Sequence, residues 1–132
     1  MVAGRGVTGD ASAALLNVTA VSPDGSGYLT VYPCGQARPN ASNVNYVGGA
    51  VVPNAVLAKI GVGGKVCVYS QLATDLVIDV NGYVPVGASP LPVVPALLLD
   101  SRSGFDTVDG QFAGSGRVGA DGVVESWLPV VV

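Results

Sequence analysis

The stretch Thr74-Asp-Leu-Val-Ile-Asp-Val80 alternates between two kinds of side chain, and this alternation decides the fold class. Its even-numbered positions are mostly aliphatic, whereas both aspartates stand at odd-numbered positions. Successive side chains of an extended strand point to opposite faces of a sheet. The stretch is therefore predicted to be a half-buried β-strand with an aliphatic core on one side and polar groups on the other.

Two further stretches, 28–33 and 65–70, show the same split. In the first, Leu29 and Val31 alternate with tyrosine and threonine, and in the second, Val66 and Val68 alternate with lysine, cysteine and tyrosine. The chain also holds 19 Gly, nine Pro and a single Glu, so that no segment of three helical turns escapes a helix breaker. These patterns predict an all-β protein.

Short β-branched or aromatic runs, bounded by Gly, Pro, Asn and Asp, recur along the whole chain. Turn residues between them predict three successive hairpins, the clearest of which joins 14–21 to 28–33 through Pro23 and Gly25. Residues 1–132 are expected to form a single all-β domain, an antiparallel β-sandwich or compact barrel of eight to nine strands. The expected strands are 14–21, 28–33, 42–47, 54–60, 65–70, 74–80, 96–102 and 123–131, with a weaker one near 111–118.

Charge is scarce, with six basic and nine acidic residues and a net charge of −3. Nucleic-acid-binding proteins concentrate Lys and Arg on one surface, whereas the basic residues here are scattered, so no nucleic-acid partner is expected. No run reaches the roughly 18 apolar residues of a membrane helix, so no membrane span is expected either. A surface rich in Ser, Thr, Asn and Gly is typical of secreted or cell-surface proteins.

Cys34 and Cys67 are the only cysteines. They are either two reduced, buried thiols or a disulfide, and we favour the disulfide because both lie beside tyrosines in neighbouring predicted strands of a secreted-type chain. Such a bridge would contribute about 3.5 kcal/mol of stability through loop closure. Two cysteines are too few for a structural zinc site, and neither a metal nor another cofactor is expected.

Catalysis is not expected, because the chain has no histidine, the commonest general base. Asp75 and Asp79 share a strand face, but four strand steps separate their α-carbons by about 13 Å. A glycosidase needs its two carboxyl groups roughly 5 to 9.5 Å apart. Asp79 and Asp100 could approach each other across strands, although Asp100 is better placed to pair with Arg102. No catalytic residue is therefore assigned.

A candidate ligand face follows from the polar side of the alternation. Aromatic rings among amides and carboxylates are how β-sandwich lectins hold sugar rings. The alternative is a hydrogen-bonded polar ladder without a ligand. The candidate residues are Tyr28, Tyr32, Tyr69, Asn43, Asn45, Asp75 and Asp79.

The C-terminal segment is a candidate for self-association, because it is apolar and only a proline interrupts it. It either folds back as an internal strand or adds to the open sheet edge of a neighbouring copy. The residues concerned are Trp127, Leu128, Val130, Val131 and Val132.

Several motifs, taken together, resemble an uncharacterised repeat of about 130 residues in large secreted actinobacterial proteins. The resemblance implies one unit of a tandem array at the cell surface, or an appendage of a secreted hydrolase, and it implies no activity. The motifs are Leu15-Leu-Asn-Val-Thr19, Gly27-Tyr-Leu-Thr-Val-Tyr-Pro-Cys-Gly35, Ala41-Ser-Asn-Val-Asn-Tyr46, Val52-Pro-Asn54, Gly64-Lys-Val-Cys-Val-Tyr-Ser70, Thr74-Asp-Leu-Val-Ile-Asp-Val-Asn-Gly-Tyr83 and Pro95-Ala-Leu-Leu-Leu-Asp-Ser-Arg102.

These observations favour a non-catalytic extracellular structural or adhesive repeat module. Its expected partners are neighbouring copies of itself and, beyond those, cell-wall or environmental polysaccharide. The second hypothesis is a carbohydrate-binding module that uses the Tyr/Asn/Asp face, and the third is a secreted hydrolase.

Overall fold

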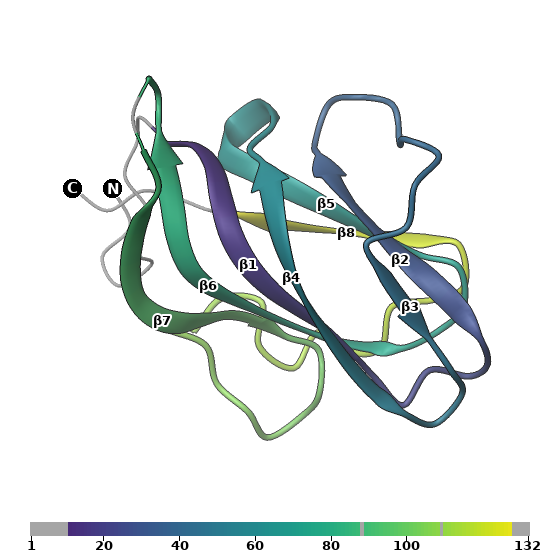
Figure 1. The fold of residues 1–132 in the computed structure, drawn as a ribbon. Helices are drawn as coiled ribbons and strands as arrows, with labels where there is room; N and C mark the ends of the chain where they lie inside the picture. Colours follow the sequence, from purple (N-terminus) through teal and green to yellow (C-terminus); the bar gives the residue numbers. More distant parts are fainter. Residues whose placement is uncertain (1–10, 88, 109, 128–132) are drawn as a thin grey trace.

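The fold is a β-sandwich of two four-stranded antiparallel sheets (Figure 1). The structure is a computed structural model and describes residues 11–87, 89–108 and 110–127. It confirms the predicted all-β class and selects the sandwich over the barrel. The strands are β1 (Ala11–Val21), β2 (Gly27–Pro33), β3 (Val44–Tyr46), β4 (Val51–Lys59), β5 (Lys65–Ser70), β6 (Asp75–Pro85), β7 (Leu91–Asp100) and β8 (Gly122–Trp127).

The first sheet has the strand order β4-β1-β6-β7 and the second has the order β3-β2-β5-β8. Their facing sides hold the predicted aliphatic side chains, which confirms the alternation in β2, β5 and β6. Burying each of these side chains contributes about 1.5–3 kcal/mol. The largest fully buried ones are Leu16, Leu29, Leu76, Ile78, Leu98, Leu99, Val18, Val44 and Val66.

The three predicted hairpins are wrong, because each joins strands of different sheets. β1 pairs with β4 and β6, whereas β2 pairs with β3 and β5. The turn residues were correct signals for a reversal of the chain, but each of these reversals carries the chain across the core. The apolar faces of β1 and β2 therefore meet as opposite walls of the sandwich. Consecutive strands pair only in β2–β3 and β6–β7 among the described strands.

Two strand boundaries also differ from the prediction. The weaker strand near 111–118 is absent from the described residues, where only the isolated bridges Thr74–Val118 and Asp100–Ala113 occur. Gly114 and Gly116 have φ of 63° and 90°, a conformation that interrupts a strand. β7, in contrast, begins earlier than predicted and includes two prolines, which its position at a sheet edge permits.

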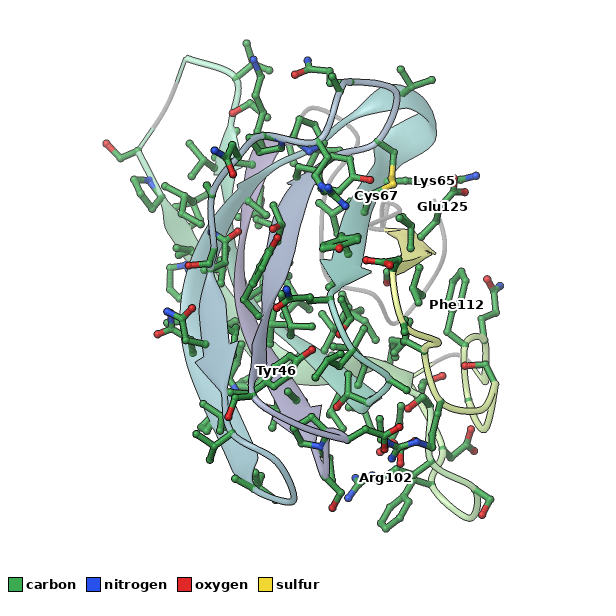
Figure 2. The ribbon with its side chains drawn as sticks, turned by 90° about the vertical axis from the view of Figure 1, so that its right-hand side faces the viewer. Tyr46, Lys65, Cys67, Arg102, Phe112 and Glu125 are labelled. Atoms are coloured by element: carbon green, nitrogen blue, oxygen red, sulfur yellow. A yellow bond between two sulfur atoms is a disulfide. The ribbon has the colours of Figure 1, made fainter. Side chains whose placement is uncertain are left out.

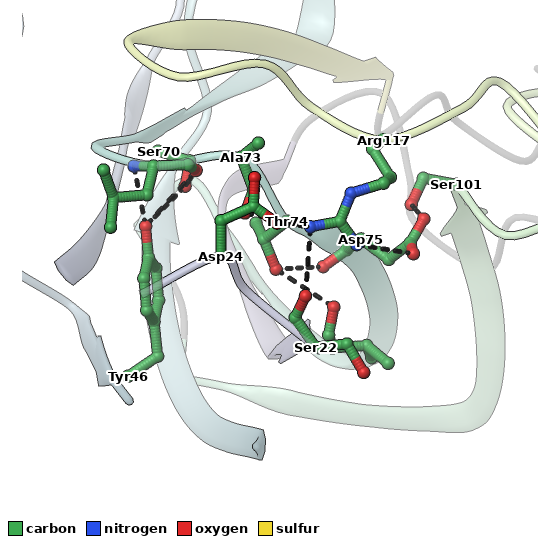
Figure 3. A network of polar contacts seen from close by, with 11 residues as sticks. Ser22, Asp24, Tyr46, Ser70, Ala73, Thr74, Asp75, Ser101 and Arg117 are labelled. Atoms are coloured by element: carbon green, nitrogen blue, oxygen red, sulfur yellow. Dashed lines mark hydrogen bonds and ion pairs between the residues drawn. The ribbon is translucent and has the colours of Figure 1, made fainter. Parts of the chain in front are cut away.

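Polar groups fasten the loops at one end of the sandwich (Figure 3). The Tyr46 hydroxyl is buried, accepts a hydrogen bond from the Leu72 amide at 2.9 Å and lies 2.9 Å from Ser70 Oγ. The Arg117 guanidinium forms ion pairs with Asp24 at 2.7 Å and with Asp75 at 3.2 Å. It thereby ties the β7–β8 connection to the β1–β2 connection and to the start of β6.

No helix within the described part of the chain is long and apolar enough to cross a membrane. The only helical element described there is the 3₁₀ turn Val62–Gly64 between β4 and β5.

The close passage of Gly61 beside Cys34 gives a stability prediction. The Val62 amide, next to Gly61, donates a hydrogen bond to the Cys34 carbonyl at 2.9 Å, and a Cβ on Gly61 would overlap the Cys34 backbone. Because the φ of Gly61 is −100°, the effect of an added methyl group is purely steric. We expect Gly61→Ala to lower the free energy of unfolding by about 2 kcal/mol in urea denaturation. Gly119→Ala is the control, because nothing lies within 4 Å of its added Cβ. Equal stability of the two variants would contradict this packing.

Candidate functional site

The candidate site lies on the outer side of the second sheet. Because Leu29 and Val31 point into the core, the alternate side chains of β2 point outward, as do those of β5. These outward side chains form a second cluster apart from the main core, which we call the aromatic face. It consists of Tyr28, Tyr32, Cys34, Cys67 and Tyr69.

The predicted disulfide between Cys34 and Cys67 is confirmed, with a Cα–Cα distance of 5.1 Å. Figure 2 shows Cys67 beside Lys65 and Glu125, which form an ion pair at 3.1 Å. Both sulfur atoms and a Glu125 carboxylate oxygen lie within 4.8 Å of one another. A metal ion would need thiolates there, and the disulfide does not provide them.

The disulfide holds the start of residues 34–43, which we call the tethered loop. Its other end is held by backbone and side-chain hydrogen bonds to β2. The backbone N–H of Asn43 donates a hydrogen bond to the Leu29 carbonyl at 2.8 Å. The side-chain Oδ1 of Asn43 accepts one from the backbone N–H of Val31 at 2.7 Å. Asn43, a predicted ligand residue, therefore has a structural role in fastening this loop.

Arg38 of the tethered loop covers Tyr69. Its guanidinium carbon lies 3.6 Å from the ring centroid, and the Tyr69 hydroxyl donates a hydrogen bond to Asp121 at 2.5 Å. This hydrogen bond, together with burial and the Asp121 charge, raises the pKa of Tyr69 above its usual value. The ring of Tyr28 is the next along the face, with its centroid 5.9 Å from that of Tyr69.

A depression of about 310 Å³ opens beside Tyr28. Asn45 lies directly opposite Tyr28 in the β2–β3 pairing, and the tethered loop forms the remaining wall. An aromatic ring, amides and a hydroxyl thus surround one space, the combination that binds a sugar ring and its hydroxyl groups. The lining residues are Tyr28, Asn40, Ala41, Ser42 and Asn45.

The predicted ligand face is divided between the two sheets. Asp75 and Asp79 point outward from β6 in the first sheet, away from the aromatic face. Alternation separates buried from outward positions, but it does not say which of the two outer faces an outward side chain joins. Asp75 is also bonded by Ser101 Oγ at 2.8 Å and by Arg117, so its role is structural.

Two carboxyl groups in the first sheet, those of Asp79 and Asp100, have shifted pKa values. Asp100 is fully buried, and Arg102 holds it with two hydrogen bonds of 2.9 and 2.7 Å, as predicted. These bonds lower the pKa of Asp100. Burial, and then the negative charge of Asp100, raises the pKa of the half-buried Asp79. Because Asp100 is sealed from solvent, the two groups do not form an open acid–base pair.

A larger depression, of about 500 Å³, lies along β8 and the loop before it. Its polar side chains are few, since glycine and valine make up much of the lining, and its arginine, Arg117, is already bound to Asp24 and Asp75. We therefore favour the smaller depression as the binding site. The predicted self-association residues Leu128, Val130, Val131 and Val132, and the side chain of Trp127, lie outside the described residues, so self-association stays a prediction.

Arg38, Asn40, Ser42 and Asp121 were not among the predicted site residues. All four lie in connections of the structure, where no strand alternation assigns a face, although Ser42 was expected to begin the strand 42–47.

The disulfide gives a prediction on redox state and stability. Native protein should contain no free thiol by mass analysis or thiol titration. The double variant Cys34→Ser/Cys67→Ser should lose about 3.5 kcal/mol in the free energy of unfolding, because its unfolded chain gains loop freedom. A reductant should lower the melting temperature of the wild type and leave that of the double variant unchanged. Two thiols that titrate in native protein would contradict the bridge.

Asp79 gives a prediction on pH. A carboxyl whose pKa is higher in the folded than in the unfolded protein destabilises the fold when ionised, and this penalty disappears below the unfolded pKa. We expect Asp79→Asn to be more stable than wild type at pH 7, with the difference shrinking as the pH falls toward 3. The exposed Asp106→Asn is the control that matches the charge change. A destabilised Asp79→Asn variant at pH 7 would show that the Asp79 charge has a favourable partner.

Comparisons of the chain with protein-family models, with curated proteins and with solved structures find no significant match.

Proposed function

We propose that this chain is a non-catalytic extracellular adhesive module that binds glycans at the depression beside Tyr28. The observation that supports this most is the grouping of one half-buried tyrosine ring with Asn40, Ser42 and Asn45 around a space of about 310 Å³. Glycans combine apolar ring faces with many hydroxyl groups. The tyrosine ring suits the former, and the amides and serine suit the latter.

The tethered loop supports a binding role because its geometry is set before any ligand arrives. The disulfide fixes its first residue and hydrogen bonds to β2 fix its last, so little conformational entropy is lost on binding. A loop held at one end only would lose more conformational entropy when it binds a ligand.

The extracellular location is supported by the same disulfide, since such bridges persist mainly in oxidising compartments. The absence of catalysis is proposed because two of the three carboxylates considered in the first sheet, Asp75 and Asp100, have structural partners, and Asp79 has no open carboxylate beside it. Asp100 is held by Arg102, and Asp75 by Ser101 and Arg117. A hydrolase would need its carboxyl groups open to substrate.

Tyr28→Ala tests the glycan-binding proposal. Wild-type protein should be retained on at least one insoluble or immobilised polysaccharide in a panel of cell-wall and plant polymers, and the variant should bind it at least about tenfold more weakly, because the stacking ring is lost. Phe105→Ala is the matched control, since Phe105 is an aromatic side chain with 51% of its surface exposed in another loop.

Circular dichroism and thermal melts should show that both variants stay folded. Retention of the wild type on none of the polymers would overturn the proposed function. An equal loss in Tyr28→Ala and Phe105→Ala would show that binding does not use this depression.

A further inference from the structure

We infer that the glycan bound at the aromatic face is acidic, and that Arg38 binds its carboxylate groups. This inference rests on the proposed function and adds the chemical class of the ligand. Three properties of Arg38 support it: its charge, the way the protein holds it, and its closeness to the depression.

Arg38 is an exposed residue of the tethered loop that forms no ion pair within the described part of the chain. Within the described residues, Arg102 and Arg117 form ion pairs with aspartates, whereas Arg38 forms none. Of the two carboxylates beside the aromatic face, Glu125 pairs with Lys65, and Asp121 keeps its negative charge but accepts a hydrogen bond from the Tyr69 hydroxyl, so neither pairs directly with Arg38. The Arg38 guanidinium therefore has no carboxylate partner among the described residues, and its N–H groups can bind the carboxylate of a ligand.

The protein fixes Arg38 in an orientation suited to a carboxylate. Its guanidinium carbon lies 3.6 Å from the Tyr69 ring centroid, so the flat face of the group is covered. The hydrogen bond from Tyr69 to Asp121 makes the ring richer in electrons and strengthens this contact. A stacked guanidinium still presents N–H groups at its edges, and their fork matches the two oxygens of a carboxylate.

Arg38 also lies close enough to the depression to act on the same ligand. Tyr69, which it covers, is the ring neighbour of Tyr28, and Asn40 is two residues further along the tethered loop. A sugar held against Tyr28 therefore places its own substituents, or those of the next sugar, beside Arg38. A uronic acid, which bears a carboxylate on its ring, supplies both the apolar face and the anion.

The test compares acidic polysaccharides with their neutral counterparts. Polygalacturonate, alginate and hyaluronan are each offered to the wild type in native form and after chemical reduction of their carboxyl groups to alcohols. We expect at least one native polymer to bind at least about tenfold more tightly than its reduced form. Added salt should weaken this binding and leave binding of the reduced form unchanged.

Variants at one position separate charge from geometry. Arg38→Gln should lose about tenfold or more in affinity for the native polymer, and Arg38→Lys should recover only part of it, because lysine keeps the charge without the fork. Lys59→Gln removes the same charge from an exposed lysine on β4 of the first sheet and should bind like wild type. All three keep the Tyr28 depression.

The outcomes distinguish the two proposals. Equal binding of native and reduced polymers, or of neutral glycans alone, would overturn the acidic ligand and leave glycan binding intact. Equal losses in Arg38→Gln and Lys59→Gln would also overturn the role of Arg38, because attraction would then follow net charge. Binding of no glycan of either kind would overturn the proposed function and this inference with it.

Discussion

The burial of two aliphatic faces against each other is the constraint on which the rest of the molecule depends. The strands that alternate most clearly, β2, β5 and β6, each place one face in this core, and their other faces become the two outer surfaces. The aromatic face is one of these surfaces. It owes its position to Leu29 and Val31 as much as to its own tyrosines, because a shift of one residue in β2 would exchange the two sets.

The outer surfaces have acquired different chemistry. On the first sheet, charged groups such as Asp75 and Asp100 are bound by serine and arginine partners and help to hold strands and loops together. On the second sheet, a disulfide and a stacked arginine organise a loop around a space. On the first surface, Asp75 and Asp100 are already bound by other side chains of the protein. The second surface presents hydrogen-bonding groups toward solvent.

Alternation in the sequence was sufficient to predict the class of fold, the buried side of most strands and the outward position of Tyr28 and Tyr69. The disulfide followed from two cysteines, the only ones in the chain, that lie beside tyrosines in predicted neighbouring strands, and the Asp100–Arg102 pair followed from two residues on the same side of one strand. Strand pairing did not follow, because a turn such as 22–26 marks a reversal and not the partner across it. Arg38 could not be placed either, since its position is set by long-range contacts of the tethered loop.

The alternation of the chain between the two sheets has a consequence for how the protein folds. β1 must pair with β6, so that Asn17 stands opposite Asp79, and neither sheet is complete until β7 or β8 has been added. Contacts of this long range make folding slow and prevent one half of the chain from folding without the other. The chain must therefore be almost fully synthesised before its core can close.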